Sequence, residues 1–406
     1  MDALTTPSNW QRVRLGDISE IKRGASPRPI ENPKWFCANS NVGWVRISDI
    51  SKNSRFLYKT AQKLSKKGIE KSRFIKQNSL IMSMCATIGK PIITKIDTCI
   101  HDGFVVFENP KIDLNYLYYF LCYIEKEWLE SGQQGSQVNL NVDLIKNKEV
   151  FYPKDLNEQI AIANILSDLD HYLYALDALI LKKESVKKAL RIKMLNQILA
   201  SNGVEFRELG DIILSLKTGL NPRSFFKLNT PNANNYYVTI RELEDYTIKF
   251  THQTDRINDN ALSLCLKRSN LEKDDILFSG TGTIGKVSII EKNPNNWAIK
   301  EGIYSIKPNK KIVFPRFLMF CLESSNIQND IKNKSFGGIV KSIPMNDLQQ
   351  IQIPLPPLNE QIAIANILSD LDNEITSLKN KKRQFENIKK ALNHDLMSTK
   401  IRVLKK

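Results

Sequence analysis

The chain has 406 residues, of which 42% are hydrophobic, and a formal net charge of +16. Its length predicts two or three domains, and the excess of positive charge indicates a polyanionic partner, nucleic acid ahead of a membrane surface. The first residues lack the apolar core of a signal peptide, and no run approaches a transmembrane span, so we expect no membrane association. The six cysteines form no CxxC pair, so we expect no metal site, no disulfide framework and a reducing, cytoplasmic location.

Residues 1–153 predict a globule of mixed helices and strands. Leu15-Gly16-Asp17-Ile18 opens it, and a short run then ends at Gly24 before a turn rich in Ser, Pro and Arg. Further on, apolar strands flank Thr87-Ile88-Gly89-Lys90, a pattern that predicts a hairpin with a glycine turn. An apolar helical patch and a polar, glycine-containing loop at 132–138 follow before the end of the globule.

Residues 154–200 predict one long helix. It begins with the sequence LNEQIAIANILSDLD at 156–170, and apolar side chains then recur on alternating steps of three and four. This heptad spacing indicates a helix that packs against another helix. At 1.5 Å per residue, a helix of about 40 residues spans roughly 60 Å. The alternative is an ordinary amphipathic helix on its own domain, but the spacing continues too far for one compact domain.

The second half of the chain follows the same order. Its globule at 201–356 has the same opening at 209–212 and the same glycine turn at 283–286, and its final segment, 357–406, begins with the same LNEQIAIANILSDLD sequence. A verbatim repeat indicates two tandem units. We therefore predict an α+β fold with two globular domains separated by two long helices, which pack as an antiparallel coiled coil with a pseudo-two-fold internal repeat.

The helix starts are identical, whereas the globules share only scaffold landmarks. Identical surfaces favour one kind of partner that binds twice, and divergent surfaces on one scaffold favour two different ligands. Recent gene conversion is the alternative explanation of the identity. The candidate partner-binding residues all lie in the repeated sequence, at Glu158, Gln159, Ile162, Glu360, Gln361 and Ile364.

Two motifs in the second globule point to enzymes, and both are incomplete. Residues 280–286 fit the phosphate-binding pattern GxxxxGK, but Val287 stands where a Ser or Thr would bind magnesium. Residues 278–282 fit the FxGxG pattern of adenosylmethionine-dependent methyltransferases, but no Asn/Asp-Pro-Pro-aromatic run accompanies it. A stand-alone DNA-modifying enzyme with its own adenosylmethionine or nucleotide site is therefore an alternative hypothesis, and a purely structural coiled-coil protein is another.

With these residues, essentially the whole chain resembles the specificity (S) subunit of a type I restriction–modification system. The resemblance rests on the two LGDI openings, the two TIGK turns and above all IPLPPLNEQIAIANILSDLD at 353–372. The first helix start departs from this pattern and reads FYPKDLNEQ at 151–159. The resemblance implies target recognition domains at 1–153 and 201–356, a central spacer helix at 154–200 and a C-terminal spacer helix at 357–406.

The resemblance implies a non-catalytic subunit that binds double-stranded DNA. Each recognition domain would read one half of a bipartite, asymmetric site. The helices would act as a ruler and as a docking platform for two modification (adenine methyltransferase) subunits, which carry the adenosylmethionine. Restriction subunits, which are ATP-dependent translocases and nucleases, would join them.

The DNA-binding candidates are polar residues in or near the glycine turns. Lysine and arginine suit phosphates and guanine, and asparagine and glutamine suit adenine. The candidates are Lys22, Arg23, Ser26, Arg28, Arg46, Lys90, Gln133, Gln134, Ser136 and Gln137 in the first domain, and Lys217, Thr218, Asn221, Arg223, Arg241, Thr281, Thr283, Lys286, Lys334, Ser335 and Lys341 in the second.

Overall fold

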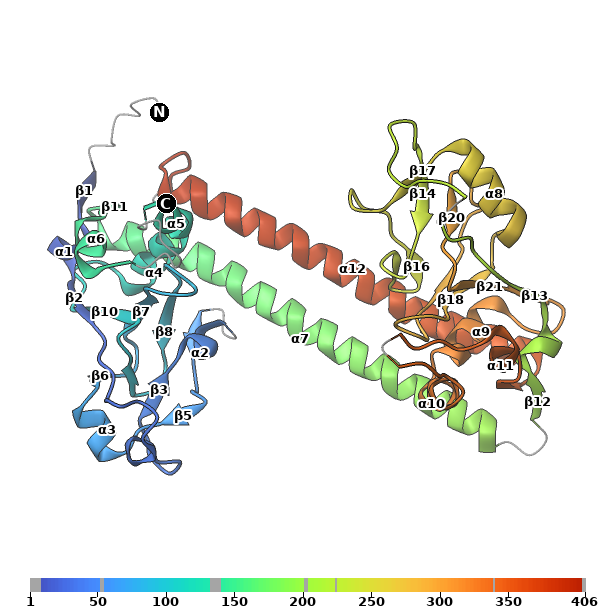
Figure 1. The fold of residues 1–406 in the computed structure, drawn as a ribbon. Helices are drawn as coiled ribbons and strands as arrows, with labels where there is room; N and C mark the ends of the chain where they lie inside the picture. The colour runs from blue at the N-terminus through green and yellow to red at the C-terminus, as the bar shows by residue number, and fades with distance from the viewer. Residues whose placement is uncertain are drawn as a thin grey trace. The chain divides into compact units, whose positions relative to one another are not determined.

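The computed structural model describes residues 9–51, 55–131, 140–200, 204–222, 225–338 and 340–403 (Figure 1). The chain divides into two compact units: unit 1 contains Met1–Ala178 and Asn380–Lys406, and unit 2 contains Leu179–Lys379. Each unit therefore combines one globule with part of both long helices, α7 (Leu156–Ala200) and α12 (Leu358–Met397). The predicted α+β class, with two β-rich domains and two long helices packed together, is confirmed.

The globule of unit 1 contains two sheets and one separate strand pair. The larger sheet has the order β2-β10-β7-β8-β4, the smaller one has the order β5-β3-β9-β6, and β1 pairs with β11. The strands are β1 (Trp10–Arg14), β2 (Glu20–Arg23), β3 (Gly43–Val45), β4 (Phe56–Leu57), β5 (Gln62–Lys63), β6 (Arg73–Ile75), β7 (Leu80–Ser83), β8 (Pro91–Thr94), β9 (Thr98–Ile100), β10 (Phe104–Glu108) and β11 (Glu149–Pro153). The helices are α1 (Leu15–Ile18), η1 (Pro33–Trp35), α2 (Ile47–Ser51), α3 (Lys66–Glu70), α4 (Leu114–Tyr123), α5 (Glu125–Ser131) and α6 (Val142–Asn147).

The globule of unit 2 is built on the same plan. Its larger sheet has the order β13-β21-β18-β19, its smaller one has the order β17-β14-β20, and β12 pairs with β22. The strands are β12 (Glu205–Glu208), β13 (Ile213–Thr218), β14 (Asn235–Val238), β15 (Leu243–Glu244), β16 (Thr247–Ile248), β17 (Arg256–Ile257), β18 (Ile276–Ser279), β19 (Val287–Ile289), β20 (Trp297–Ile299), β21 (Ile303–Pro308) and β22 (Gln352–Leu355). The helices are η2 (Leu209–Ile212), α8 (Asp259–Ser269), α9 (Pro315–Leu322), α10 (Ser325–Asn333) and α11 (Met345–Gln349).

An inner strand of each larger sheet, β7 in unit 1 and β18 in unit 2, is buried on both faces. In β7, Leu80 and Met82 belong to one hydrophobic core, and Ile81 between them belongs to another. The same alternation runs along β18. A strand that is covered on both faces needs apolar residues at every position, which explains the continuous apolar runs in the sequence. Helices α4 and α9 supply apolar side chains to the core on one face.

A buried glutamine joins each long helix to its own globule. Gln159 is 3% exposed; its side chain accepts a hydrogen bond from the backbone N of Asp113 (2.8 Å) and donates one to the carbonyl of Pro153 (2.8 Å). Gln361 accepts the equivalent bond from the backbone N of Phe314 (2.8 Å). Asp113 and Phe314 are the N-cap residues of α4 and α9. Each glutamine therefore fixes the start of the long helix to the start of the covering helix.

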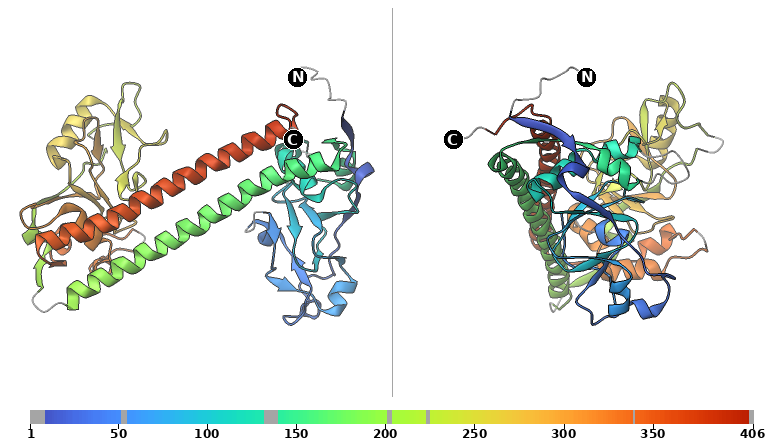
Figure 2. Two further views of the ribbon diagram at one scale, coloured as in Figure 1. Left: turned by 180° about the vertical axis from the view of Figure 1, so that it is seen from behind. Right: turned by 90° about the vertical axis from the view of Figure 1, so that its left-hand side faces the viewer.

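Within each unit, the segments of the two long helices run antiparallel and side by side (Figure 2). Among the described residues, five ion pairs connect them: Asp170–Lys389 and Asp177–Lys382 in unit 1, and Lys187–Asp372, Lys183–Glu374 and Glu184–Lys379 in unit 2. Residue numbers rise along α7 as they fall along α12, so the predicted antiparallel pairing is present in each unit. None of the helices in the described ranges has the length and apolar character needed to cross a membrane.

Candidate nucleic-acid interface

Each globule carries a glycine hairpin, as predicted. Residues 84–90 join β7 to β8, and residues 280–286 join β18 to β19. A buried serine at the end of the first strand holds each turn. Ser279 Oγ donates to the carbonyl of Thr283 (2.6 Å) and accepts from the backbone N of Lys286 (2.8 Å), and the equivalent serine makes the same contacts in unit 1. The turn is therefore fixed on the larger sheet.

The hairpin of unit 2 uses its backbone N–H groups within its own globule. A loop that cradles phosphate presents free N–H groups to the ligand. Here the N–H groups of Gly280, Gly282 and Gly285 each donate to a carbonyl of the globule, at 2.8, 2.8 and 2.9 Å. Gly280 is required for packing, because a Cβ there would lie 2.2 Å from the ring of Tyr304. Both enzyme-like motifs thus form a structural turn.

In unit 1, Asp102 brings three predicted residues together. Ser26 Oγ donates to one carboxylate oxygen (2.8 Å), Arg28 donates to the other (2.9 Å), and Arg23 Nε donates to the carbonyl of Asp102 (2.7 Å). Gly24 permits this approach, because a Cβ there would lie 2.0 Å from the nearest backbone carbonyl oxygen. The Arg28 side chain remains 70% exposed, so its guanidinium is held at one edge and otherwise faces solvent.

Sequence reasoning missed three members of this group, Asp102, His101 and Cys85. His101 Nδ1 accepts a hydrogen bond from the backbone N of Gly103 (2.8 Å), and Cys85 Sγ lies 3.9 Å from the carbonyl oxygen of Gly103. Burial lowers the pKa of His101 and raises the pKa of Cys85, so both side chains are neutral at pH 7. No sequence signal marks Asp102, because its partner Ser26 lies 76 positions away in the chain.

Arg46 forms a second polar group in unit 1, which we call the edge site. It follows β3, and its Nη1 donates to the Oε1 of Gln62 (3.1 Å) at the start of β5. The turn is anchored by the buried Asp49, which accepts a hydrogen bond from the backbone N of Arg46 (2.9 Å). The edge site of unit 1 therefore presents a guanidinium and a neutral amide.

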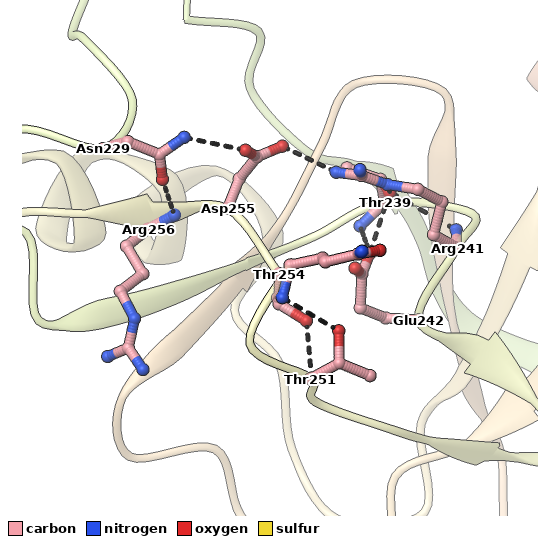
Figure 3. Close-up of polar contacts among 9 residues, drawn as sticks. Asn229, Thr239, Arg241, Glu242, Thr251, Thr254, Asp255 and Arg256 are labelled. Carbon is pink, nitrogen blue, oxygen red and sulfur yellow. Dashed lines mark hydrogen bonds and ion pairs between the residues drawn. The ribbon is translucent and has the colours of Figure 1, made fainter. Parts of the chain in front are cut away.

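Unit 2 has the corresponding edge site with different chemistry (Figure 3). β14 pairs with β17 and β20 as β3 pairs with β5 and β9, which identifies the equivalent position. Arg241 Nη2 and Asn229 Nδ2 donate to the two carboxylate oxygens of Asp255, at 2.8 and 2.9 Å. The buried Glu242 accepts a hydrogen bond from the backbone N of Thr239 (2.8 Å). This bond is equivalent to the one from the backbone N of Arg46 to Asp49, which anchors the turn in unit 1. This edge site presents a guanidinium, a carboxylate and an amide.

An aromatic stack lies beside the edge site of unit 2. The guanidinium of Arg256 is 4.4 Å from the ring centroid of Tyr236, and Tyr236 stacks on Phe250 with 4.4 Å between centroids. Figure 3 shows the Arg256 side chain directed away from the carboxylate of Asp255, while its backbone N contacts Asn229. Sequence reasoning missed Asn229, Asp255 and Arg256, which follow no recognisable motif.

Several predicted DNA-binding residues are separate from these groups. Lys22 pairs with Glu108 (2.6 Å) and Glu20 (2.9 Å), and the hydrogen bond to Glu108 raises the pKa of Lys22. Lys334 donates to Gln350 (3.2 Å). Thr281, Thr283 and Lys341 are exposed near the glycine hairpin of unit 2, and Lys90, Lys217, Thr218, Asn221 and Ser335 are half-buried. Lys286 is exposed as well, but its ammonium donates to the carbonyls of Ile240 (3.5 Å) and Leu243 (3.4 Å), in the turn that carries Arg241. Gln133, Gln134, Ser136, Gln137 and Arg223 lie outside the described residues.

The structure separates the predicted partner-binding residues into buried and exposed ones. Gln159, Ile162 and Gln361 are at most 3% exposed and pack within their own unit. Glu158 is half-buried and accepts hydrogen bonds from Asn9 (3.0 Å) and Trp10 (3.2 Å). Ile364 is half-buried, and Glu360 is exposed.

A set of apolar side chains in the repeated sequence faces solvent, and we call it the exposed strip. The strip consists of Leu156 and Ile160, which lie about one helical turn apart and are 53% and 37% exposed in the first copy; Ile165 is also 37% exposed but lies on another face of the helix. The second copy exposes its equivalents, Leu358, Ile362 and Ile367, at 38%, 36% and 44%. Single exposed apolar residues are ordinary on protein surfaces, so the informative observation is that the same positions are exposed in both copies. Across the described ranges, no group of three or more His, Cys, Asp or Glu residues could hold a metal ion.

Comparisons with known proteins agree with this architecture. The profile of the type I restriction modification DNA specificity domain matches twice, at residues 7–184 and 201–387. The type I restriction enzyme MjaVIII specificity subunit of Methanocaldococcus jannaschii is 24% identical over 431 residues, 99% of this chain and 95% of that protein. The EcoBI specificity subunit of Escherichia coli is 32% identical over 110 residues, 27% of this chain and 23% of that protein.

Solved structures show the same fold. The type I restriction–modification S subunit from M. genitalium superposes with a TM-score of 0.59 at 16% identity, covering 98% of this chain and 97% of that one. A chain from a structural study of assembly and conformational transition in the type I system gives a TM-score of 0.58 at 15% identity, covering 97% and 98%. The two profile matches together span most of the chain, which therefore belongs to the family of type I restriction–modification DNA specificity subunits, the non-catalytic members of such systems.

Proposed function

We propose that each globule reads one half of a bipartite, asymmetric site in double-stranded DNA. The observation that carries this proposal is the pair of edge sites. They lie on the turn after the same strand of the small sheet, yet one presents Arg46 with Gln62 and the other presents Arg241, two positions further along the turn, with Asp255. Hydrogen bonds to base edges depend on the pattern of donors and acceptors, so two different patterns on one scaffold would select different bases.

Arg241 is prepared for such contacts. Its side chain is 57% exposed, although Nη2 is held by Asp255 (2.8 Å) and Nε donates to Thr239 Oγ1 (3.4 Å). An arginine that is anchored at one edge loses little side-chain freedom when its other nitrogens bind a base. Arg28 is anchored in the same way by Asp102 in unit 1. Exposed cations on nearby helices, such as Lys67 on α3 and Lys267 on α8, would hold phosphates without reading sequence.

Methylome sequencing tests this proposal. A strain that contains the gene should carry one bipartite methylated motif that a strain without the gene lacks. Exchange of residues 1–153 for another domain of this family should change one half of the motif and leave the other half unchanged. A change in both halves would contradict independent reading by the two globules.

A pair of point variants refines the test. Arg241→Ala should relax base preference in the half read by unit 2, at a cost of about 1–3 kcal/mol of discrimination per lost bidentate contact. Lys267→Ala, on the exposed face of α8, is the matched control, because a lost phosphate contact weakens binding to all sequences alike and lowers its salt dependence. Equal loss of preference in both variants would contradict the assignment.

The exposed strip is the proposed docking platform for two modification subunits, after which restriction subunits would join. Its support is that the same apolar residues face solvent in both copies of the repeat. Ile160→Asp and Ile362→Asp should each remove one modification subunit in native mass spectrometry, and the double variant should remove both. Leu181→Asp, at a residue that is 64% exposed outside the repeat, is the control and should leave the stoichiometry unchanged.

A further inference from the structure

Each unit contains a buried polar joint where its globule meets the long helices. The joint of unit 1 consists of Arg55, Asn115, Tyr119, Cys122, Ser167, Asp170, Lys389 and Asn393. The joint of unit 2 consists of Tyr246, Phe320, Glu323, Ser369, Asp372, Lys187 and Arg191. These joints lie apart from the edge sites, and nothing in DNA reading requires them.

The two joints correspond position by position. On the long helices, the verbatim repeat aligns Asp170 with Asp372. On the covering helices, the glutamine hydrogen bonds make Asp113 and Phe314 equivalent. By the same alignment, Cys122 of unit 1 and Glu323 of unit 2 occupy equivalent positions. In the larger sheets, the carbonyls of Arg55 and Tyr246 each accept a hydrogen bond (2.9 Å) from the second strand of the hairpin, so these two residues are equivalent as well.

One part of the joint is the same in both units. Asp170 pairs with Lys389, and Asp372 pairs with Lys187. The lysines are equivalent under the same repeat as the aspartates. These two ion pairs therefore do not distinguish one end of the helices from the other.

The remaining part of the unit 1 joint is organised by Arg55. This residue is only 5% exposed, and its guanidinium donates to Tyr119 Oη (2.8 Å), Ser167 Oγ (2.7 Å) and Asn115 Oδ1 (2.6 Å). Cys122 and Asn393, together with Tyr119, line a pocket of about 400 Å³. Burial raises the pKa of Cys122 to about 12, so this position carries no charge at pH 7.

Unit 2 fills the equivalent positions with an ion pair. Arg191, which stands where unit 1 has Asn393, pairs with Glu323, which stands where unit 1 has Cys122. Tyr246 replaces Arg55 and donates to Glu323 Oε1 (2.7 Å), and the ammonium of Lys187 lies 4.1 Å from the Tyr246 ring centroid.

Two equivalent serines, Ser167 and Ser369, differ in the hydrogen bonding of their hydroxyls. Ser167 accepts the hydrogen bond from Arg55 in unit 1. Ser369 belongs to the identical helix sequence, but its buried Oγ has no hydrogen-bond partner among the described residues. The helix start thus offers the same group to both globules, and only the globule with the arginine uses it.

We infer that each joint makes its globule compatible with only one end of the helix pair, so that the two globules cannot exchange positions. If the proposed function holds, this also fixes the order of the two half-sites along the DNA. The physical reason is the charge at the joint. With the first globule on the second helix end, Arg55, Lys187 and Arg191 would share one carboxylate, Asp372. A buried cation without a partner is strongly destabilising.

A position exchange tests the inference by thermal unfolding, which does not depend on DNA reading. In the swapped full-length chain, residues 9–153 and 204–355 change places while both long helices stay. We expect it to unfold about 10 °C below the natural chain. Adding Arg191→Asn together with Asn393→Arg restores both natural charge combinations, and most of the lost stability should return.

A control separates the joint from other effects of the exchange. Swapping globules also alters apolar contacts near Ile198 and Leu396. The rescue is therefore judged against the swapped chain with Lys182→Gln and Gln384→Lys, a reciprocal exchange at two exposed, equivalent helix positions. Equal stability of these two swapped chains would overturn the inference, and so would a swapped chain as stable as the natural one.

A second measurement in the natural order covers the case in which the swapped chain does not fold. Arg191→Asn leaves Glu323 without its cation, and Glu323→Cys leaves Arg191 without its carboxylate, so each should lower the unfolding temperature by several degrees. The double variant recreates the unit 1 composition at this position and should be more stable than the two separate losses add up to. Additive losses would overturn the inference.

Discussion

Asp170 forms an ion pair with Lys389, and the residues equivalent to them in the 202-residue repeat, Asp372 and Lys187, form an ion pair as well. Each long helix therefore supplies the carboxylate near its start and the ammonium further along. Because both helices carry both groups at the same spacing, one antiparallel register satisfies both pairs. A shift of the helices by one turn would leave two carboxylates and two ammonium groups without partners, so these pairs select a single register.

The Lys187–Asp372 pair should contribute more to stability than a surface pair. The lysine side chain is only 10% exposed, and burial raises the pKa of Asp372 even with the lysine in place. Lys187→Met would leave this carboxylate without its cation and should cost about 3 kcal/mol in the free energy of unfolding. Lys188→Met, at the exposed neighbouring position, is the control and should change it by less than about 0.5 kcal/mol. Equal effects in denaturant unfolding would contradict the register argument.

The helices and hairpins could be predicted from the sequence because their signals are local. A verbatim repeat and a heptad spacing gave 154–200 and 357–406, close to α7 and α12. The TIGK turns between apolar strands predicted hairpins that the structure contains. The heptad spacing and the TIGK pattern each lie within one continuous segment, and the repeat adds a second copy of each.

The polar groups could not be predicted in the same way. Asp102 contacts Ser26 across 76 positions, and Arg55 contacts Ser167 across 112, so no local pattern connects the partners. Identity in the repeat also has two causes that the sequence does not separate. Gln159 and Gln361 are buried, and their internal hydrogen bonds explain why both positions are glutamine. Ile160 and Ile362 are exposed, so no internal contact of this kind explains why both positions are isoleucine.

The glutamine bonds should be essential for fixing each long helix to its globule. Gln159→Ala would leave the partly buried backbone N of Asp113 without this acceptor, at an expected cost of about 1–3 kcal/mol. Gln361→Ala should have a similar effect in unit 2. Asn157→Ala, at an exposed position two residues earlier, is the matched control and should be close to neutral. Thermal unfolding that is unchanged in both glutamine variants would show that water replaces the side chain.

Gly24 should tolerate no side chain. A Cβ at this position would lie 2.0 Å from the carbonyl oxygen of His101, so Gly24→Ala must push β2 away from the loop that contains Asp102. We expect a loss of about 3 kcal/mol in stability and weaker reading of the half-site assigned to unit 1. Gly338→Ala, where a Cβ meets nothing within 4 Å, should be neutral. Unchanged unfolding and methylation in Gly24→Ala would refute the close approach.

Asp275 should make the stability of unit 2 depend on pH. This residue is 2% exposed, and burial raises its pKa from the ordinary value of 3.8 to about 6. Between these two values the folded chain binds a proton that the unfolded chain has lost, so this group's contribution to stability falls as pH rises from about 4 to about 6 and is constant above that. Asp275→Asn should therefore be more stable than the natural chain at pH 7, by a few degrees in unfolding temperature, and this advantage should shrink toward pH 4. An advantage that is constant across the range would contradict the assignment.

The length of the helix pair should set the gap between the two half-sites. DNA-binding modules on one face of a duplex favour half-site centres about one turn, roughly 10 base pairs, apart. Ala178 of α7 and Asn380 of α12 are equivalent in the repeat, and the ion pairs Asp177–Lys382 and Glu184–Lys379 lie on either side of them. Residues inserted after Ala178 and after Asn380 therefore lie opposite each other. Four residues in each helix add about 6 Å, close to two base-pair rises.

The double insertion should lengthen the gap in the methylated motif by about two base pairs and leave both half-sites unchanged. An insertion after Ala178 alone is the control: it would move the Lys187–Asp372 pair out of register while Asp170–Lys389 stays in place, so it should lower the unfolding temperature and abolish methylation. The ruler hypothesis fails if the double insertion alters the bases read in either half, or if methylation persists with the original gap. In the second case the gap would be set by how the globules bind DNA, and the helices would serve only for docking.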